Sequence, residues 1–201
     1  MVLPNQLTVL RIILTPVFMF FFLSEDNTMK QISIAIFIVA AITDWYDGWL
    51  ARKFNYITTW GKFMDPLADK ILTSAAFFGF VFLGVLQMWM VIAIVIRDFL
   101  ITILRLIAEY QNKSFYTSKA AKWKTFIQMT FIYYLLIVYT LQTVESIYIG
   151  NENIFRMMLD PVFIYWTMLA VTIFTLYTGF TYLHKNKRII MRLFQSENKS
   201  V

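Results

Sequence analysis

Four aspartates lie close together in a chain that is otherwise mostly apolar, and they form two pairs, Asp44 with Asp47 and Asp65 with Asp69. On a helix each pair shares one face, with Cβ atoms roughly 5–6 Å apart. A carboxylate at bilayer depth costs roughly 2.5–3.5 kcal/mol on insertion scales, so we expect cations to compensate the cluster. An all-oxygen ligand set favours hard cations, namely Mg²⁺, Mn²⁺ or Ca²⁺. Four carboxylates on two adjoining helices could hold two such ions about 3.5–4 Å apart.

The neighbouring residues fit a phosphate ligand. A metal pair would grip and polarise a diphosphate. Gly48 leaves bare backbone that a ligand can approach closely, and Arg52, four residues later, can bind a phosphate from the same helix face. The alternative is that the aspartates are helix caps and surface charges. Asp65 followed by Pro66 predicts a helix N-cap with proline at the first helical position.

The composition indicates an integral membrane protein with several spans in a single domain, 1–201. Of the 201 residues 59% are hydrophobic and 15% charged, and the mean hydropathy is +0.63. The chain has no Cys and one histidine, His184, which excludes disulfides, thiolate metal sites and histidine clusters. The net charge of +6 is spread over short loops, which favours a membrane surface over nucleic acid.

Long apolar runs predict the elements that must position these residues. As one helix, the 44 residues from Asp65 to Ala108 would be about 66 Å long, so we expect a turn at Gly84–Gln87. The prediction is an all-α bundle of six transmembrane helices at 7–23, 31–51, 66–84, 88–108, 122–142 and 160–184, followed by a polar, frayed cytoplasmic tail, 185–201.

The distribution of lysine and arginine predicts the orientation of this bundle. Of the 18 lysines and arginines, all but Lys30 and Arg156 fall on the side of the predicted termini. The positive-inside rule therefore places both termini and the aspartates on the cytoplasmic side.

The pattern D-x2-D-G-x2-A-R-x8-G-x3-D-x3-D, from Asp44 to Asp69, resembles the signature of the CDP-alcohol phosphatidyltransferases at all eight fixed positions. The resemblance implies six membrane helices, commonly a homodimer, and transfer of a phosphatidyl group from CDP-diacylglycerol to an alcohol with release of CMP. It implies Mg²⁺ or Mn²⁺, as two ions, on Asp44, Asp47, Asp65 and Asp69, with Asp69 also the general base. The residues expected to bind the donor are Asn5, Thr8, Gly48, Arg52 and Gly61.

Three further stretches, 4–11, 97–105 and 118–125, resemble bacterial phosphatidylglycerophosphate synthases, which implies glycerol 3-phosphate as the acceptor and a bacterial cell membrane. A phosphorylated acceptor needs polar and cationic groups beyond the metal site, and the candidates are Arg105, Ser118, Lys119, Lys122 and Lys124. The lysines could instead belong to a positive-inside loop or contact anionic lipid headgroups. Arg97–Asp98, in mid-helix, could be an ion pair between helices or part of the acceptor pocket.

Two alternatives remain open from the sequence. One is the same chemistry with another acceptor, such as inositol phosphate or serine. The other is a divalent-cation transporter, which is disfavoured because the carboxylates lie at one membrane face and because Gly48 and Arg52 would have no purpose in it.

Overall fold

The computed structural model describes residues 3–54, 59–111, 113, 115 and 119–197. Within these ranges the side chains of residues 3–5, 44–54, 59, 60, 62, 192 and 194–197 are not described. Across the described ranges the secondary structure is helical, without strands, which confirms the all-α prediction.

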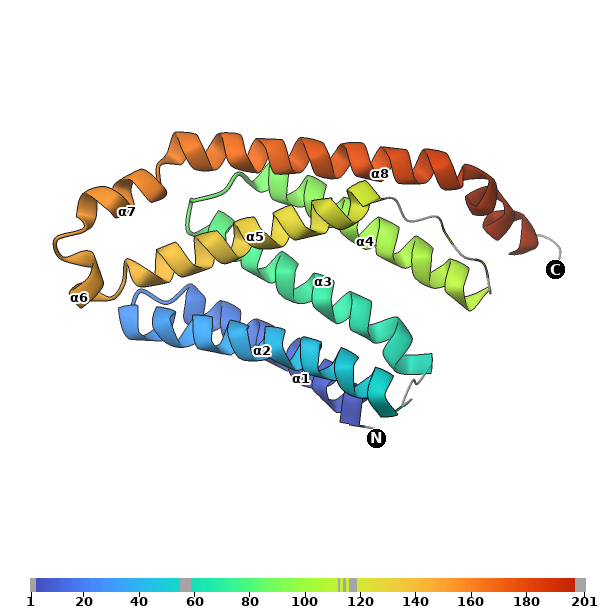
Figure 1. Ribbon diagram of the computed structural model, residues 1–201, viewed down its shortest axis with the longest axis horizontal. Coiled ribbons are helices and arrows are strands. Elements are labelled where there is room, and N and C mark those ends of the chain that lie inside the picture. The colour runs from blue at the N-terminus through green and yellow to red at the C-terminus, as the bar shows by residue number, and fades with distance from the viewer. Residues whose placement is uncertain (1–2, 55–58, 112, 114, 116–118, 198–201) are drawn as a thin grey trace.

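Six long helices run back and forth along one axis (Figure 1). The ends of α2, α4 and α8 and the beginnings of α1, α3 and α5 lie toward one end of the bundle, which we call the polar end. Two short helices precede α8 at the opposite end. The bounds are α1 Leu3–Phe22, α2 Asn27–Phe54, α3 Thr59–Phe82, α4 Met88–Tyr110, α5 Lys119–Leu141, α6 Glu145–Tyr148, α7 Glu152–Met158 and α8 Pro161–Glu197.

Two predicted helix boundaries are wrong. Asp65 and Pro66 lie inside α3 and not at its N-cap, because the helix already begins at Thr59. A proline removes one backbone donor, which a helix tolerates where neighbouring helices hold it in place. The predicted end of the last helix at 184 is also wrong: α8 continues to Glu197, and Asn186 and Leu193 are buried, so this segment packs against the bundle despite its polar composition.

The predicted turn between the third and fourth long helices is confirmed. Gly84 adopts a φ of +74°, in the left-handed region that favours glycine, and α4 begins at Met88. The turn sends α4 back toward the polar end, so the residues after Asp65 on α3 and those in the second half of α4 lie at the same level (Figure 1).

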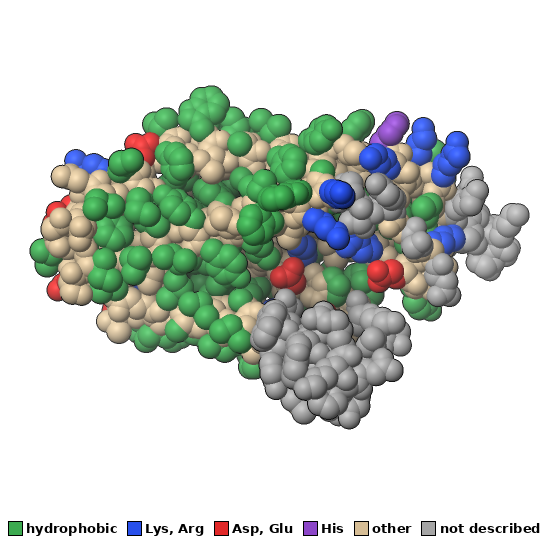
Figure 2. Space-filling view, viewed as in Figure 1, with side chains coloured by type: hydrophobic (Ala, Val, Ile, Leu, Met, Phe, Trp, Pro, Cys, Tyr) green, Lys and Arg blue, Asp and Glu red, His purple; other side chains and the backbone are tan. Residues whose placement is uncertain are grey.

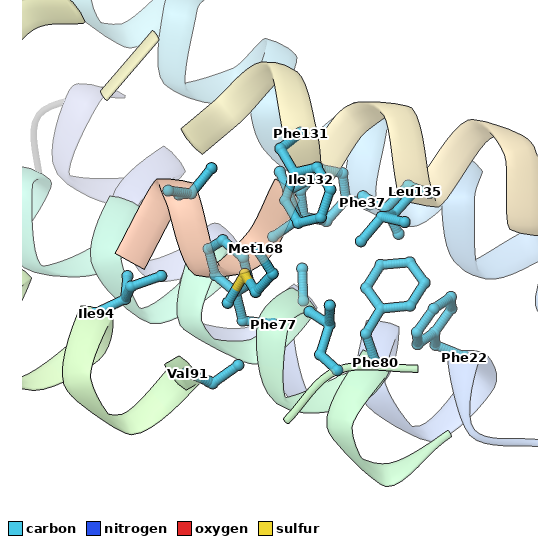
Figure 3. Packing of buried hydrophobic residues seen from close by; sticks show 14 of the residues in the cluster. Phe22, Phe37, Phe77, Phe80, Val91, Ile94, Phe131, Ile132, Leu135 and Met168 are labelled. Atoms are coloured by element: carbon cyan, nitrogen blue, oxygen red, sulfur yellow. The ribbon is translucent and has the colours of Figure 1, made fainter. Parts of the chain in front are cut away.

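Aromatic packing fixes α1, α2 and α3 to one another. The buried rings of Phe22 and Phe80 meet edge to face at 5.1 Å between centroids, and Phe18 lies 5.2 Å from both Phe22 and Phe37. Figure 3 shows Phe22, Phe37 and Phe80 among the buried apolar side chains that form the core between the helices. A Cβ at Gly79 would come within 2.8 Å of the Phe22 ring, so a glycine is needed for α3 to approach α1 this closely.

On the face that Figure 2 shows, charged side chains lie toward the two ends and hydrophobic side chains cover much of the surface between them. Lysine and arginine gather at the polar end. Large apolar side chains such as Phe20, Ile96 and Phe180 are exposed. By length and composition, two stretches of the described chain could cross a membrane, Lys119–Leu141 and Glu152–Met191, and two shorter apolar helices cover Gln6–Phe22 and Asn27–Thr43. Six spans and a cytoplasm-facing site stay predictions.

Candidate active site

A cavity of about 370 Å³ opens near the polar end between α3, α4, α5 and α8. Its wall is rich in charged groups, with acidic and basic side chains interspersed. They include Asp69, Lys70, Arg97, Asp98, Arg105 and Lys124.

The cavity wall contains an ion cluster centred on Asp98. The carboxylate of Asp98 is buried, and its Oδ1 accepts hydrogen bonds from Lys124 Nζ and, at 3.0 Å, from Arg97 Nη1. Lys70 Nζ lies 3.8 Å from the other oxygen, Oδ2. Side chains from α3, α4 and α5 therefore converge on one carboxylate, so Arg97–Asp98 joins helices and also lines the cavity.

Helix α8 also shapes the cluster, although the sequence analysis assigned it no site residue. Arg97 Nη2 donates a hydrogen bond to Thr178 Oγ1 at 3.1 Å. A Cβ at Gly179 would lie 2.8 Å from Arg97 Cγ, so the glycine provides the space in which Arg97 crosses α8. The signal in the sequence was a glycine within an otherwise bulky apolar helix, a common mark of close packing.

Asp69 connects the cavity to the aspartate motif. It lies one turn after Asp65 on α3, its side chain is 33% exposed, and Lys70 Nζ is 3.7 Å from its Oδ2. A carboxylate with this exposure is accessible to a soluble molecule that enters the cavity. Lys70 thus stands between Asp69 on one side and Asp98 on the other, at 3.7 and 3.8 Å.

Helix α1 supports the motif from the other side. The buried Thr8 hydroxyl donates a hydrogen bond to Asp65 Oδ1, across the α1–α3 contact. Arg11, also buried, donates from Nε to the Ala40 carbonyl of α2 at 3.3 Å. Thr8 therefore orients an aspartate of the motif, as the groups behind metal-binding carboxylates commonly do.

The described side chains fit part of the predicted metal site. Asp65 and Asp69 offer oxygen atoms one helical turn apart, the donor chemistry that hard divalent cations prefer. Asp44 and Asp47 lie in α2, but their side chains fall outside the described ones. The side chains that are described include no group of three or more that could hold a metal ion.

The remaining candidate residues fall into three groups. Of the acceptor candidates, Arg105 and Lys124 line the cavity, whereas Lys119 is exposed at the start of α5 and Lys122 is exposed beside Trp123. Of the donor candidates, Gly61 is buried in α3. Ser118 lies outside the described residues. Asn5, Gly48 and Arg52 lie in helices, but only their backbone is described. Lys70, which the sequence analysis did not select, joins Arg105 and Lys124 at the cavity.

Comparison with known proteins decides the family. The family model described as CDP-alcohol phosphatidyltransferase matches residues 1–177, which cover the whole aspartate motif and the cavity residues up to α5. The chain belongs to this family.

Several relatives in the family carry a more specific name. A CDP-diacylglycerol–glycerol-3-phosphate 3-phosphatidyltransferase of Bacillus subtilis is 39% identical over 147 residues, which are 67% of this chain and 76% of the relative. A Rickettsia bellii protein of the same name is 33% identical over 178 residues, 89% of this chain and 93% of the relative. A probable phosphatidylglycerophosphate synthase of Mycobacterium tuberculosis is 39% identical over 129 residues, 63% of this chain and 61% of the relative.

Proposed function

We propose that the protein transfers a phosphatidyl group from CDP-diacylglycerol to glycerol 3-phosphate, giving phosphatidylglycerophosphate and CMP in phospholipid biosynthesis. The observation that carries the proposal is the cavity, which brings Asp69 together with Lys70, Arg97, Arg105 and Lys124. A carboxylate beside a group of cations suits an acceptor that has both a hydroxyl to deprotonate and a phosphate to bind. The names of the bacterial relatives support the same two substrates.

The acceptor's phosphate binds the cations of the cavity. Each charge-assisted hydrogen bond to a desolvated phosphate contributes roughly 1.5–3 kcal/mol. Arg105, exposed at the mouth, offers a planar fork of donors, and Lys124, buried deeper, offers a point charge. A neutral alcohol would gain none of these contacts, so the cavity favours a phosphorylated acceptor.

Asp69 accepts the proton of the acceptor's hydroxyl. The freed oxygen attacks the phosphorus that carries diacylglycerol, the new P–O bond forms, and the P–O bond to CMP breaks. A hydroxyl is a poor nucleophile until a positioned base takes its proton in the transition state. Asp69 is placed for this step because its partly exposed carboxylate lines the same cavity as the cations.

Asp44, Asp47, Asp65 and Asp69 would hold one or two divalent ions, Mg²⁺ or Mn²⁺. When bound, such ions neutralise the charge of a diphosphate and of the departing phosphate. Thr8 fixes the orientation of Asp65 through its hydrogen bond. Gly48, Arg52, Gly61 and Asn5 remain our candidates for holding the cytidine diphosphate end of the donor.

The setting that we propose is the bacterial cell membrane, with the six long helices as spans and the protein as a homodimer. Helix α4, with 23 residues, is about 34 Å long, close to the roughly 30 Å thickness of a bilayer's hydrocarbon core. Exposed Ile96 and Phe180 lie where lipid would cover them. The lysines and arginines at the polar end support a cytoplasmic position for the cavity, where a soluble phosphate ester would be available.

An acceptor panel tests the proposal. The purified protein in detergent micelles with CDP-diacylglycerol and Mg²⁺ receives labelled glycerol 3-phosphate, inositol phosphate or serine, and the lipid product and CMP are quantified. We expect product with glycerol 3-phosphate at a kcat/KM at least about a hundredfold above that for serine, which lacks a phosphate and so loses two or more charge-assisted contacts. If the protein prefers serine or inositol phosphate, the assignment of glycerol 3-phosphate as the acceptor is wrong. Metal flux in proteoliposomes without CMP release would indicate a transporter.

A further inference from the structure

Asp98 is unexpected in a cavity that binds a phosphate. A carboxylate repels a phosphate, yet Asp98 lines the cavity and is 3% exposed. Its partner Lys124 is even less exposed, at 1%. Neither the base nor the metal site uses this aspartate.

The contacts of Asp98 hold like charges together. Lys124 and Arg97 both donate to Oδ1 of the buried Asp98, so their charged ends lie side by side with little exposure to water. Like charges at such separations repel strongly away from water. Without a carboxylate between them, the ammonium of Lys124 and the guanidinium of Arg97 would move apart, and Lys124 would lose the hydrogen-bond acceptor that Asp98 provides.

The charge that remains suits a phosphate monoester. Lys70, Arg97 and Lys124 are three cations against the carboxylates of Asp98 and Asp69, which leaves one positive charge in excess, so the cluster attracts a phosphate monoester dianion more than an uncharged alcohol. The Lys70 ion pairs, at 3.7 and 3.8 Å, are longer than the roughly 2.7–2.9 Å of a direct charge-assisted hydrogen bond. Lys70 can therefore turn toward a phosphate without breaking a strong contact.

We infer that Asp98 is a positioning residue that holds Lys124, Arg97 and Lys70 in the arrangement that binds the acceptor's phosphate. The inference rests on the proposed function, since it assigns the cluster to that acceptor. Asp98 does not touch the phosphate; it acts through the cations, and it makes the cavity selective for a phosphate monoester over an uncharged alcohol.

The test compares Asp98→Asn with wild type in the full-length protein. We expect the KM for glycerol 3-phosphate and the inhibition constant of inorganic phosphate to rise at least roughly tenfold, as loss of one well-formed charge-assisted contact predicts. The KM for CDP-diacylglycerol should stay within about twofold. Asp98→Glu, which keeps the charge, should restore part of the affinity. Glu25→Gln, which neutralises an exposed carboxylate at the opposite end, is the matched control.

A double variant tests whether Asp98 acts by positioning Lys124. Asp98→Asn with Lys124→Gln leaves no unpaired charge in that pair, so it remains informative where the single variant does not fold. We expect Asp98→Asn to raise the KM for glycerol 3-phosphate less in the Lys124→Gln background than in wild type, because Asp98 acts partly through Lys124 and partly through Arg97 and Lys70.

An unchanged or lower KM in Asp98→Asn, or a double variant that binds glycerol 3-phosphate much more tightly than Lys124→Gln, would overturn the inference. Wild type serves as the reference for the proposed function. If wild type fails to use glycerol 3-phosphate, the proposed function fails; if wild type uses it and only the variants disagree, the positioning role alone fails.

Discussion

Chelation of divalent metal should abolish CMP release from CDP-diacylglycerol, and Mg²⁺ or Mn²⁺ should restore it. The motif brings four carboxylates to a negatively charged diphosphate, and without cations these groups repel each other. The loss should therefore be complete and not a matter of a few-fold. The measurement is CMP formation by the purified protein after treatment with a chelator, followed by titration with each metal.

Two variants sharpen the metal test. Asp65→Asn removes one formal charge from the cation site, so it should raise the metal concentration required for half-maximal activity. Glu25→Gln, an exposed carboxylate far from the motif in the sequence, should leave that concentration unchanged. Full activity in metal-free buffer would rule out metal ions on the aspartates.

Replacing Asp69 with asparagine should lower kcat by roughly 10²–10⁴-fold, the usual contribution of a positioned acid or base. The amide keeps the size of the side chain but cannot accept the hydroxyl's proton. The donor KM should change less than kcat, because three of the four carboxylates that we assign to the metal site, Asp44, Asp47 and Asp65, remain. Initial rates with varied CDP-diacylglycerol at saturating glycerol 3-phosphate give both constants.

The control for Asp69→Asn is Asp26→Asn, at the opposite end of the molecule, where the carboxylate only caps the start of α2 through the Thr28 amide. This variant should affect stability at most and leave kcat near wild type. Turnover of Asp69→Asn within about twofold of wild type would assign the base to another group, since a loss of proton transfer cannot be that small.

Much of the fold could be predicted from the apolar runs in the sequence and from residues that favour turns. The turn at Gly84 could be predicted because a single helix from Asp65 to Ala108 would be far longer than a bilayer is thick. The prediction of a helix start at Asp65–Pro66 is wrong because the same dipeptide occurs at helix starts and, as here, inside a helix held by tertiary packing. The extension of α8 to Glu197 depends on burial of Leu193, which local polarity does not reveal.

Some residues of the site could likewise be predicted from the sequence, and others could not. Asp65, Asp69 and Arg105 could be selected because charged residues next to apolar runs are costly and therefore informative. Lys70 resembled an ordinary lysine at a helix end, and only the packing of α3 against α4 brings it to Asp98. Thr178 gave no signal in the sequence, and Gly179 indicated only close packing, since their role is to support and accommodate Arg97 from another helix.

The central claim is that the cations of the cavity bind the acceptor's phosphate. It is tested most directly by the ratio of kcat/KM for glycerol 3-phosphate to kcat/KM for glycerol, measured in wild type, Arg105→Ala and Arg188→Ala. Arg105 lines the cavity, whereas Arg188 is an exposed arginine of α8 outside its lining. We predict that Arg105→Ala lowers the ratio roughly ten- to a hundredfold, by loss on glycerol 3-phosphate alone, and that Arg188→Ala leaves it unchanged. A ratio that is unchanged in Arg105→Ala, or equal losses on both acceptors, would contradict the account.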